Sequence, residues 1–241
     1  MYNITIVSAF LSNINNNKKI EKYIEWSKIL ININLPKIIF IEQEIYNKYF
    51  NDESYPNTKF IIIKRSDLYL YKYYDKITNF NIQTDNPNKD TIDYLFVQCN
   101  KTEWVREAIL LNYYKTDQFI WLDFSIYHVI KDISLFENEI NSLNNKLYNN
   151  VRIPGCWNPN NEQNYNVYNT ICWYFSGGIF GGNKDKLIDF ANLTREKCIN
   201  VINEKNNIIW EVNIWYLIYK DNPELFSYYY GNHDLTILSN Y

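Results

Sequence analysis

The chain has 241 residues, of which 46% are hydrophobic and 21% are charged, and its formal net charge is −3. This composition is that of a globular protein large enough to bury a core, and it excludes a disordered chain. Acidic and basic residues are interspersed, which argues against a nucleic-acid-binding protein, because such proteins usually carry a basic face.

The chain also lacks the usual signs of membrane insertion or export. No apolar run approaches the roughly 18 residues of a transmembrane helix, and the start, MYNITIVSAF, has no basic region before its apolar stretch. The four cysteines are scattered and form no CxxC pair. Free thiols in a reducing compartment are therefore expected, and we predict a cytoplasmic location.

Strands and helices alternate over the first 64 residues. Short apolar runs predict strands at 3–10, 37–41 and 59–64, with a polar loop at 12–17. Apolar residues at helical spacing predict helices at 19–31 and 43–50. This alternation is typical of a parallel sheet whose strands are joined by crossover helices.

The rest of the chain continues the mixed pattern after an irregular segment at 65–88. Residues 90–111 predict one helix or two stacked helices, and the wholly apolar centre of 118–123 predicts a central strand. The remaining predicted elements are helices at 132–147, 184–201 and 208–219, strands at 170–175 and 227–230, and a long loop at 154–169. No repeat or linker divides the chain, so we expect a single α/β domain.

The stretch FIWLDFSIYH, residues 119–128, runs from a buried strand into Asp123. Open α/β sheets bind ligands beyond the carboxyl ends of their strands, and a carboxylate there suits Mg²⁺ or Mn²⁺, with Ser125 as a weaker oxygen ligand. The alternative is an aspartate that only marks a turn, with His128 packed nearby.

Four of the six glycines lie within residues 177–182, in FSGGIFGGNKDKLIDF. Glycine permits close approach of a ligand to the backbone, and Asn183 is placed to cap a helix whose N-terminus favours negative charge. A phosphate or sugar contact at Gly177 and Gly178 is one interpretation, and two tight turns between strands are the other.

Three further motifs carry candidate residues. In IIWEVNIWYLIY, Glu211 is a carboxylate among apolar neighbours, which suits either proton transfer or a helix start, and Trp210 and Trp215 flank it. In YYYGNHDLT, His233 is either a metal ligand or a surface residue. The cations of the helix before residue 118, Lys101 and Arg106, could meet a diphosphate or stay solvated.

In this order, LLNYYKTDQFIWLDFSI, SGGIFGGNKDKL, WEVNIW and YYYGNH resemble the HtrL/WlaTC-like family of bacterial glycosyltransferases. Residues 177–215 are also similar to the blood-group A/B-type glycosyltransferases. The resemblance implies a GT-A fold, a Rossmann-type mixed sheet flanked by helices, with a nucleotide-sugar-binding half at 1–125 and an acceptor-binding half at 126–241. It also implies a nucleotide-sugar donor, commonly a UDP-sugar.

The resemblance assigns roles to individual residues. The uridine would rest on Ser8, Ala9 and Phe10, at the end of the first strand. Asp123 falls where such enzymes keep a D-x-D metal motif, which reads D-F-S here, and His233 falls where several of them keep a metal-binding histidine. Glu211 is offset from the acidic residues of the blood-group pattern.

These observations predict a metal-assisted hexosyltransferase. Its donor is expected to contact Ser8, Ala9, Phe10, Lys101, Arg106, Asp123, Gly177 and Gly178. Glu211 is the predicted catalytic residue, Trp210 and Trp215 are predicted to bind a glycan or glycosylated-protein acceptor, and Asp123, Ser125 and His233 are predicted to hold Mn²⁺ or Mg²⁺. The alternatives are a non-catalytic carbohydrate- or protein-binding module on the same fold, and a hydrolase of nucleotide sugars or phosphoesters.

Overall fold

The computed structural model describes residues 2–12, 19–52, 54–161 and 163–241. The strands are β1 (Ile4–Phe10), β2 (Lys37–Glu42), β3 (Thr58–Ile63), β4 (Gln118–Leu122), β5 (Val151–Gly155), β6 (Ile179–Asn183) and β7 (Phe226–Tyr230). The helices are α1 (Ile20–Asn32), α2 (Gln43–Tyr49), α3 (Ile92–Cys99), α4 (Lys101–Leu111), α5 (Tyr127–Ile130), α6 (Ile133–Ser142), α7 (Lys184–Lys205), α8 (Glu211–Asp221) and α9 (Thr236–Ser239).

The strands form one sheet in the order β3-β2-β1-β4-β6-β5-β7. The first four in that order are mutually parallel, so their carboxyl ends meet at one edge. β6 is antiparallel to both β4 and β5. The start of β6 therefore lies beside the end of β4, and the segments that follow β1 and β4 share one edge of the sheet with the segment that precedes β6.

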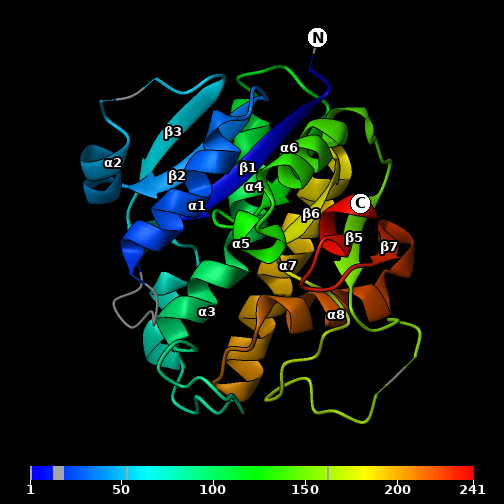
Figure 1. The fold of residues 1–241 in the computed structure, drawn as a ribbon. Coiled ribbons are helices and arrows are strands. Elements are labelled where there is room, and N and C mark those ends of the chain that lie inside the picture. The colour runs from blue at the N-terminus through cyan, green and yellow to red at the C-terminus, as the bar shows by residue number, and fades with distance from the viewer. Residues whose placement is uncertain (1, 13–18, 53, 162) are drawn as a thin grey trace.

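Helices cover both faces of the sheet (Figure 1). Because side chains alternate along a strand, Val7, Phe119 and Trp121 pack on the face covered by α3, α4, α7 and α8. Ile6 and Ile120 point to the opposite face, under α1 and α6. This double burial explains why the central strands read as unbroken apolar runs.

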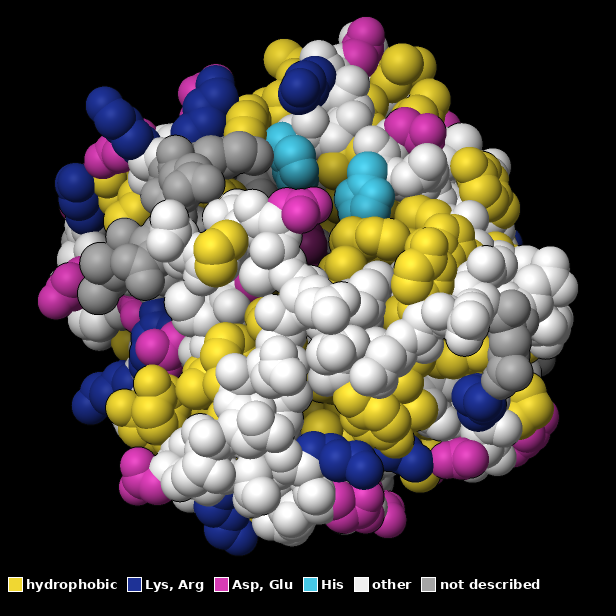
Figure 2. Space-filling view, turned by 90° about the horizontal axis from the view of Figure 1, so that it is seen from below, with side chains coloured by type: hydrophobic (Ala, Val, Ile, Leu, Met, Phe, Trp, Pro, Cys, Tyr) yellow, Lys and Arg dark blue, Asp and Glu magenta, His cyan; other side chains and the backbone are white. Residues whose placement is uncertain are grey.

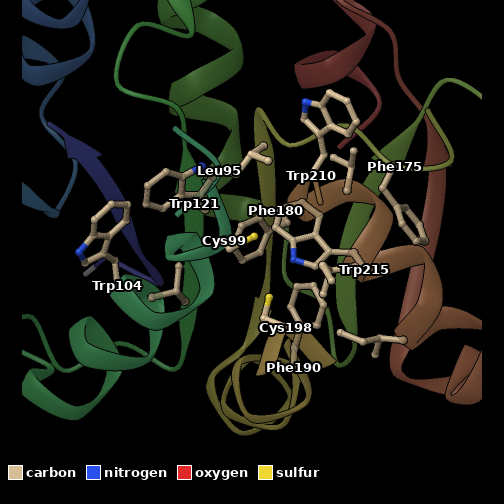
Figure 3. Close-up of a cluster of buried hydrophobic side chains, with 14 of the residues drawn as sticks. Leu95, Cys99, Trp104, Trp121, Phe175, Phe180, Phe190, Cys198, Trp210 and Trp215 are labelled. Carbon is tan, nitrogen blue, oxygen red and sulfur yellow. The ribbon is translucent and has the colours of Figure 1, made fainter. Parts of the chain in front are cut away.

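Stacked aromatic rings join the two halves of the core on the α4 and α7 face (Figure 3). The indoles of Trp104 and Trp121 are nearly parallel at 5.8 Å between ring centroids, and Trp121 stacks on Phe180 at 6.3 Å. Phe180 in turn contacts Trp215 at 5.1 Å. These contacts tie β4 and β6 to α4 and α8, which are about 100 residues apart in the chain, so the protein is a single domain.

The predicted fold, a Rossmann-type mixed sheet flanked by helices, is confirmed. Residues 90–111, predicted as one helix or two stacked helices, form two helices that meet at Asn100. The predicted loop at 12–17 lies, apart from Ser12, outside the described residues. Among the described helices, none has both the length and the apolar character needed to cross a bilayer.

The strand predicted at 170–175 is wrong. That segment makes an isolated bridge at Thr170 and then turns. Its backbone is satisfied by a side chain instead of a sheet: the fully buried Asn213 accepts from Cys172 N at 2.8 Å and donates to the carbonyls of Val167 and Thr170, each at 2.7 Å. The apolar run in TICWYF therefore reflects burial beneath α8 and not strand pairing.

Strand β5 was not predicted, because Pro154 and Gly155 within it are typical of a turn.

The glycine block also differs from the prediction. Gly181 and Gly182 belong to β6, and Gly182 has φ +143° with no room for a side chain, since a Cβ there would lie 2.2 Å from Asn150 O. Asn183 does cap α7, with its side chain accepting from Asp185 N, but it pairs with Gln118 at the opposite edge of the sheet. The predicted phosphate site at that helix start is therefore wrong.

Candidate active site

A cavity of about 1210 Å³ lies at the sheet edge where β1 and β4 end and β6 begins. Ala9 and Phe10 line it at the end of β1, Asp123 after β4, and Gly177 and Gly178 before β6. Figure 2 views the molecule from below and shows both histidines of the chain, His128 and His233, side by side on one face with hydrophobic side chains beside them. Both histidines line the cavity.

The ammonium group of Lys101 joins three segments of chain at this cavity. Lys101 begins α4 and is buried, and its Nζ lies 3.0 Å from Asp123 Oδ1 and 3.0 Å from Glu211 Oε1. It also donates to Gly177 O at 3.0 Å. Because both carboxylate oxygens lie 3.0 Å from the same nitrogen, they are no more than about 6 Å apart.

These contacts determine the charge state of Lys101. Burial alone would lower its pKa, but the carboxylates of Asp123 and Glu211 outweigh that effect and raise the pKa. The ammonium therefore stays charged. It donates to Gly177 O and Glu211 Oε1, and two carboxylates balance its charge. We therefore revise the predicted role of Lys101 from donor contact to positioning the two carboxylates.

Asp123 is aimed into the cavity by its own strand. Trp121 lies two residues earlier, on the same side of β4, and its indole N–H donates to Asp123 Oδ1 at 2.9 Å. The side chain of Asp123 is 37% exposed. Oδ1 thus accepts from Trp121 and lies against the Lys101 ammonium, and Oδ2 is the atom left for a ligand.

Glu211 opens helix α8, as the sequence indicated, but it is buried and not a solvated helix-start residue. Trp210, which precedes it, also lines the cavity. Gly177 leaves the room that the ion pair needs, because a Cβ there would lie 2.3 Å from Glu211 Oε1. The first glycine pair therefore belongs to the site, through contact with this carboxylate.

Two aromatic–histidine pairs form part of the cavity wall. His233 packs edge-on against Trp173, with ring centroids 4.8 Å apart. Burial and then the nearby His128 lower the pKa of His233, so its imidazole is neutral and able to accept a bond at neutral pH. His128 stacks on Trp26 at 5.3 Å, and its Nδ1 is 2.7 Å from Ser125 O.

The predicted metal ligands line the cavity, but they do not form a cage. Within the described ranges, no three His, Cys, Asp or Glu side chains are grouped as a metal site. The groups available to a cation are Asp123 Oδ2, the Ser125 side chain and the neutral imidazole of His233. Such a set fits only a cation that takes its other ligands from bound phosphates or water, as Mg²⁺ usually does.

Three predicted site residues lie elsewhere. Ser8 points into the core, fully buried, while its neighbours Ala9 and Phe10 reach the cavity. Trp215 is fully buried among Phe180 and Phe190 and does not line the cavity, so its predicted contact with an acceptor is wrong.

Arg106 is also remote from the cavity lining. Its Nε and Nη2 donate to Glu103 Oε2 at 3.0 and 2.6 Å. Glu103 also pairs with Arg195, which fixes α4 to α7. In place of the predicted contact with a diphosphate, Arg106 thus forms an ion pair within its own helix, α4.

The lining residues that sequence reasoning missed include Arg65, Tyr94 and Trp173. Trp173 lies in the segment that was mistaken for a strand. Arg65 follows β3 in a stretch that reads as irregular, and Tyr94 is one of 23 tyrosines. Only the position of Arg65 directly after a parallel strand could have identified it.

Comparison with known proteins identifies a family. A search of curated protein sequences finds no match. Among solved structures, the chain is similar to apo mouse xyloside xylosyltransferase 1, with 11% identity over 95% of this chain and 84% of that chain and a TM-score of 0.46. It is also similar to 4-diphosphocytidyl-2C-methyl-D-erythritol synthase from Anaerococcus prevotii DSM 20548, with 8% identity over 98% and 89% and a TM-score of 0.43. The model of a family described as bacterial proteins of unknown function matches residues 2–236, and the chain therefore belongs to the HtrL_YibB family.

Proposed function

We propose that this protein is a glycosyltransferase that moves a sugar from a nucleotide-sugar donor, a UDP-sugar in the first instance, to a hydroxyl of a glycan or glycosylated-protein acceptor. The observation that carries the proposal is the pair of carboxylates, Asp123 and Glu211, held by the buried Lys101 beside a large cavity at the carboxyl edge of an α/β sheet. This edge is where open α/β folds bind their ligands.

The two halves of the chain supply different parts of the site. The half at 1–125 provides Ala9, Phe10 and Asp123, where we place the nucleotide and its diphosphate. The half at 126–241 provides Trp173, Trp210 and Glu211, where we place the acceptor. Aromatic faces suit the apolar faces of sugar rings, and the cavity is larger than the roughly 300–1,000 Å³ typical of a site for one small ligand.

Glu211 is the residue that we assign to the chemical step. Its carboxylate lies beside the cavity and no more than about 6 Å from that of Asp123. In transfer it accepts the proton of the acceptor hydroxyl, or stabilises positive charge at the anomeric carbon, while the bond to the diphosphate breaks. A divalent cation on Asp123, Ser125 and His233 stays a prediction, and its chemistry would be to neutralise the leaving diphosphate.

Ligand binding tests the proposal first. A ligand that binds only the folded state raises the melting temperature, so the purified protein is screened with UDP-, GDP- and CMP-sugars, each with and without Mn²⁺. We expect a rise with one nucleotide class, larger with Mn²⁺ if the cation site forms. A flat response to every donor would count against nucleotide-sugar transfer.

Turnover then separates the roles of the two carboxylates. Glu211→Gln should keep donor affinity within a few-fold and lose about two or more decades of turnover, measured as UDP release with acceptor. Asp123→Asn should lose both affinity and turnover. Glu204→Gln, on the exposed side of α7, is the matched control for removing one negative charge. Near-normal transfer by Glu211→Gln would make Glu211 a structural carboxylate.

A non-catalytic carbohydrate-binding module is the second candidate. It is supported by Ser125, which stands where a second metal-binding carboxylate would be, and by the aromatic wall of Trp173 and Trp210. Such a module would bind a glycan without releasing UDP or hydrolysing the donor, so the turnover assay decides between the two.

We further propose a cytoplasmic location, with which the four free thiols, Cys99, Cys156, Cys172 and Cys198, are consistent.

A further inference from the structure

Most of the charged side chains that line the cavity form ion pairs with one another. Lys101 is held between Asp123 and Glu211. Lys89 lies 3.8 Å from Asp90 Oδ1, and both residues line the cavity. A nucleotide sugar carries two negative charges on its diphosphate, and neither of these lysines has a free charge to offer it.

Arg65 is different. It lines the cavity, and no ion pair joins it to any carboxylate of the described residues. Among the described residues, its Nη2 donates a hydrogen bond to the backbone carbonyl of Ser12. A guanidinium has five N–H donors in a rigid fork, so most of its donors and its whole charge remain available.

The fold places this guanidinium at the sheet edge that borders the cavity. Arg65 follows β3, which lies two strands from β1, but its contact with Ser12 brings Nη2 across β2 to a point two residues past the end of β1. β1 is the neighbour of β4, and Arg65 and Asp123 line the same cavity.

The carboxylate of Glu42, which contacts the same Ser12, does not neutralise this charge. Glu42, at the end of β2, accepts hydrogen bonds from Ser12 N and Ser12 Oγ at 2.7 and 2.6 Å. It forms no ion pair with Arg65 within 4 Å among the described contacts. Glu42 thus fixes the position of Ser12, and Ser12 in turn holds the guanidinium at the cavity.

We infer that Arg65 binds the diphosphate of the nucleotide donor and is the cation that the protein itself supplies for that group. The inference rests on the proposed function and adds to it a donor-binding residue, in place of Lys101 and Arg106. The fork of a guanidinium matches two phosphate oxygens, and such charge-assisted bonds are among the stronger contacts in a binding site.

Calorimetric titration of UDP and of uridine into the full-length protein tests this role. Arg65→Gln should weaken UDP binding by about 10- to 100-fold, the usual effect of losing hydrogen bonds to a charged group. Uridine, which has no phosphate, should bind the variant within about two- to threefold of the wild-type affinity. Arg65→Lys should recover part of the loss, because it keeps the charge without the fork.

The neighbouring Lys64→Gln, which removes an exposed cation that does not line the cavity, is the matched control and should leave UDP affinity unchanged. Equal loss of UDP and uridine in Arg65→Gln would show that Arg65 only supports the Ser12 segment, and unchanged UDP affinity would show that it has no role in binding. Either result overturns the inference while leaving the proposed function intact. A wild-type protein that binds neither UDP nor any other nucleoside diphosphate would overturn both.

Discussion

Replacing Lys101 by methionine should expose the repulsion that the ammonium now balances. The carboxylate oxygens of Asp123 and Glu211 are at most about 6 Å apart, and at an effective dielectric constant of 20 two such charges repel by about 3 kcal/mol. Removing one partner of a buried ion pair typically costs about 3–5 kcal/mol. Because Asp123 is partly exposed, we expect the lower end, about 3 kcal/mol.

For a chain of this size, that loss corresponds to a fall of about 6 to 12 °C in the melting temperature. The assay is urea unfolding at pH 7 of the wild type, Lys101→Met, Glu211→Gln and the double variant. In the double variant the repulsion is absent, so it should be about 2–3 kcal/mol more stable than the sum of the single changes predicts.

The exposed pair of Lys197 and Asp221, 2.9 Å apart between α7 and α8, is the matched control. Its cycle, from Lys197→Met and Asp221→Asn, should give less than about 1 kcal/mol. If the Lys101 and Glu211 cycle gave an equally small coupling energy, Lys101 would not be balancing these carboxylates, and the proposed arrangement of the site would fail.

Three other predictions follow from contacts away from the carboxylates. Burial lowers the pKa of Lys37 to about 7. Between pH 7 and 10 the side chain is therefore protonated in the unfolded chain and mostly neutral in the folded protein. The free energy of unfolding of the wild type, relative to that of Lys37→Met, should rise by about 1 kcal/mol per pH unit in that window. Asn213→Ala removes three hydrogen bonds to the backbone, of which the one to Cys172 N is buried. It should cost about 2–4 kcal/mol in urea unfolding, whereas an effect below about 1 kcal/mol would mean that the loop finds other partners. Arg106→Gln should leave UDP affinity within about twofold of the wild type in calorimetry, and a tenfold loss would restore Arg106 to the donor site.

The elements set by local pattern could be predicted from the sequence. β1, β2, β4 and α1 are long apolar runs or clear helical periodicities, and their burial follows from that pattern. Asp123 could be identified because it directly follows a central strand.

What could not be predicted depends on contacts far apart in the chain. The backbone of 170–175 is held by Asn213, about 40 residues later, so no local pattern distinguishes this segment from a strand. The roles of Lys101 and Arg106 were interchangeable in the sequence, because both lie on one helix. Only the fold shows that one meets Asp123 and the other meets Glu103.

The convergence of three distant segments on Lys101 also bears on when the protein acquires its site. Asp123, Gly177 and Glu211 lie 22, 76 and 110 residues after Lys101. A nascent chain that ends just after β4 contains only one of these three partners of Lys101, Asp123. Since a domain generally folds as a unit, the buried ammonium gains its last carboxylate only when α8 docks. The arrangement of Lys101 between two carboxylates therefore forms only when the fold is nearly complete.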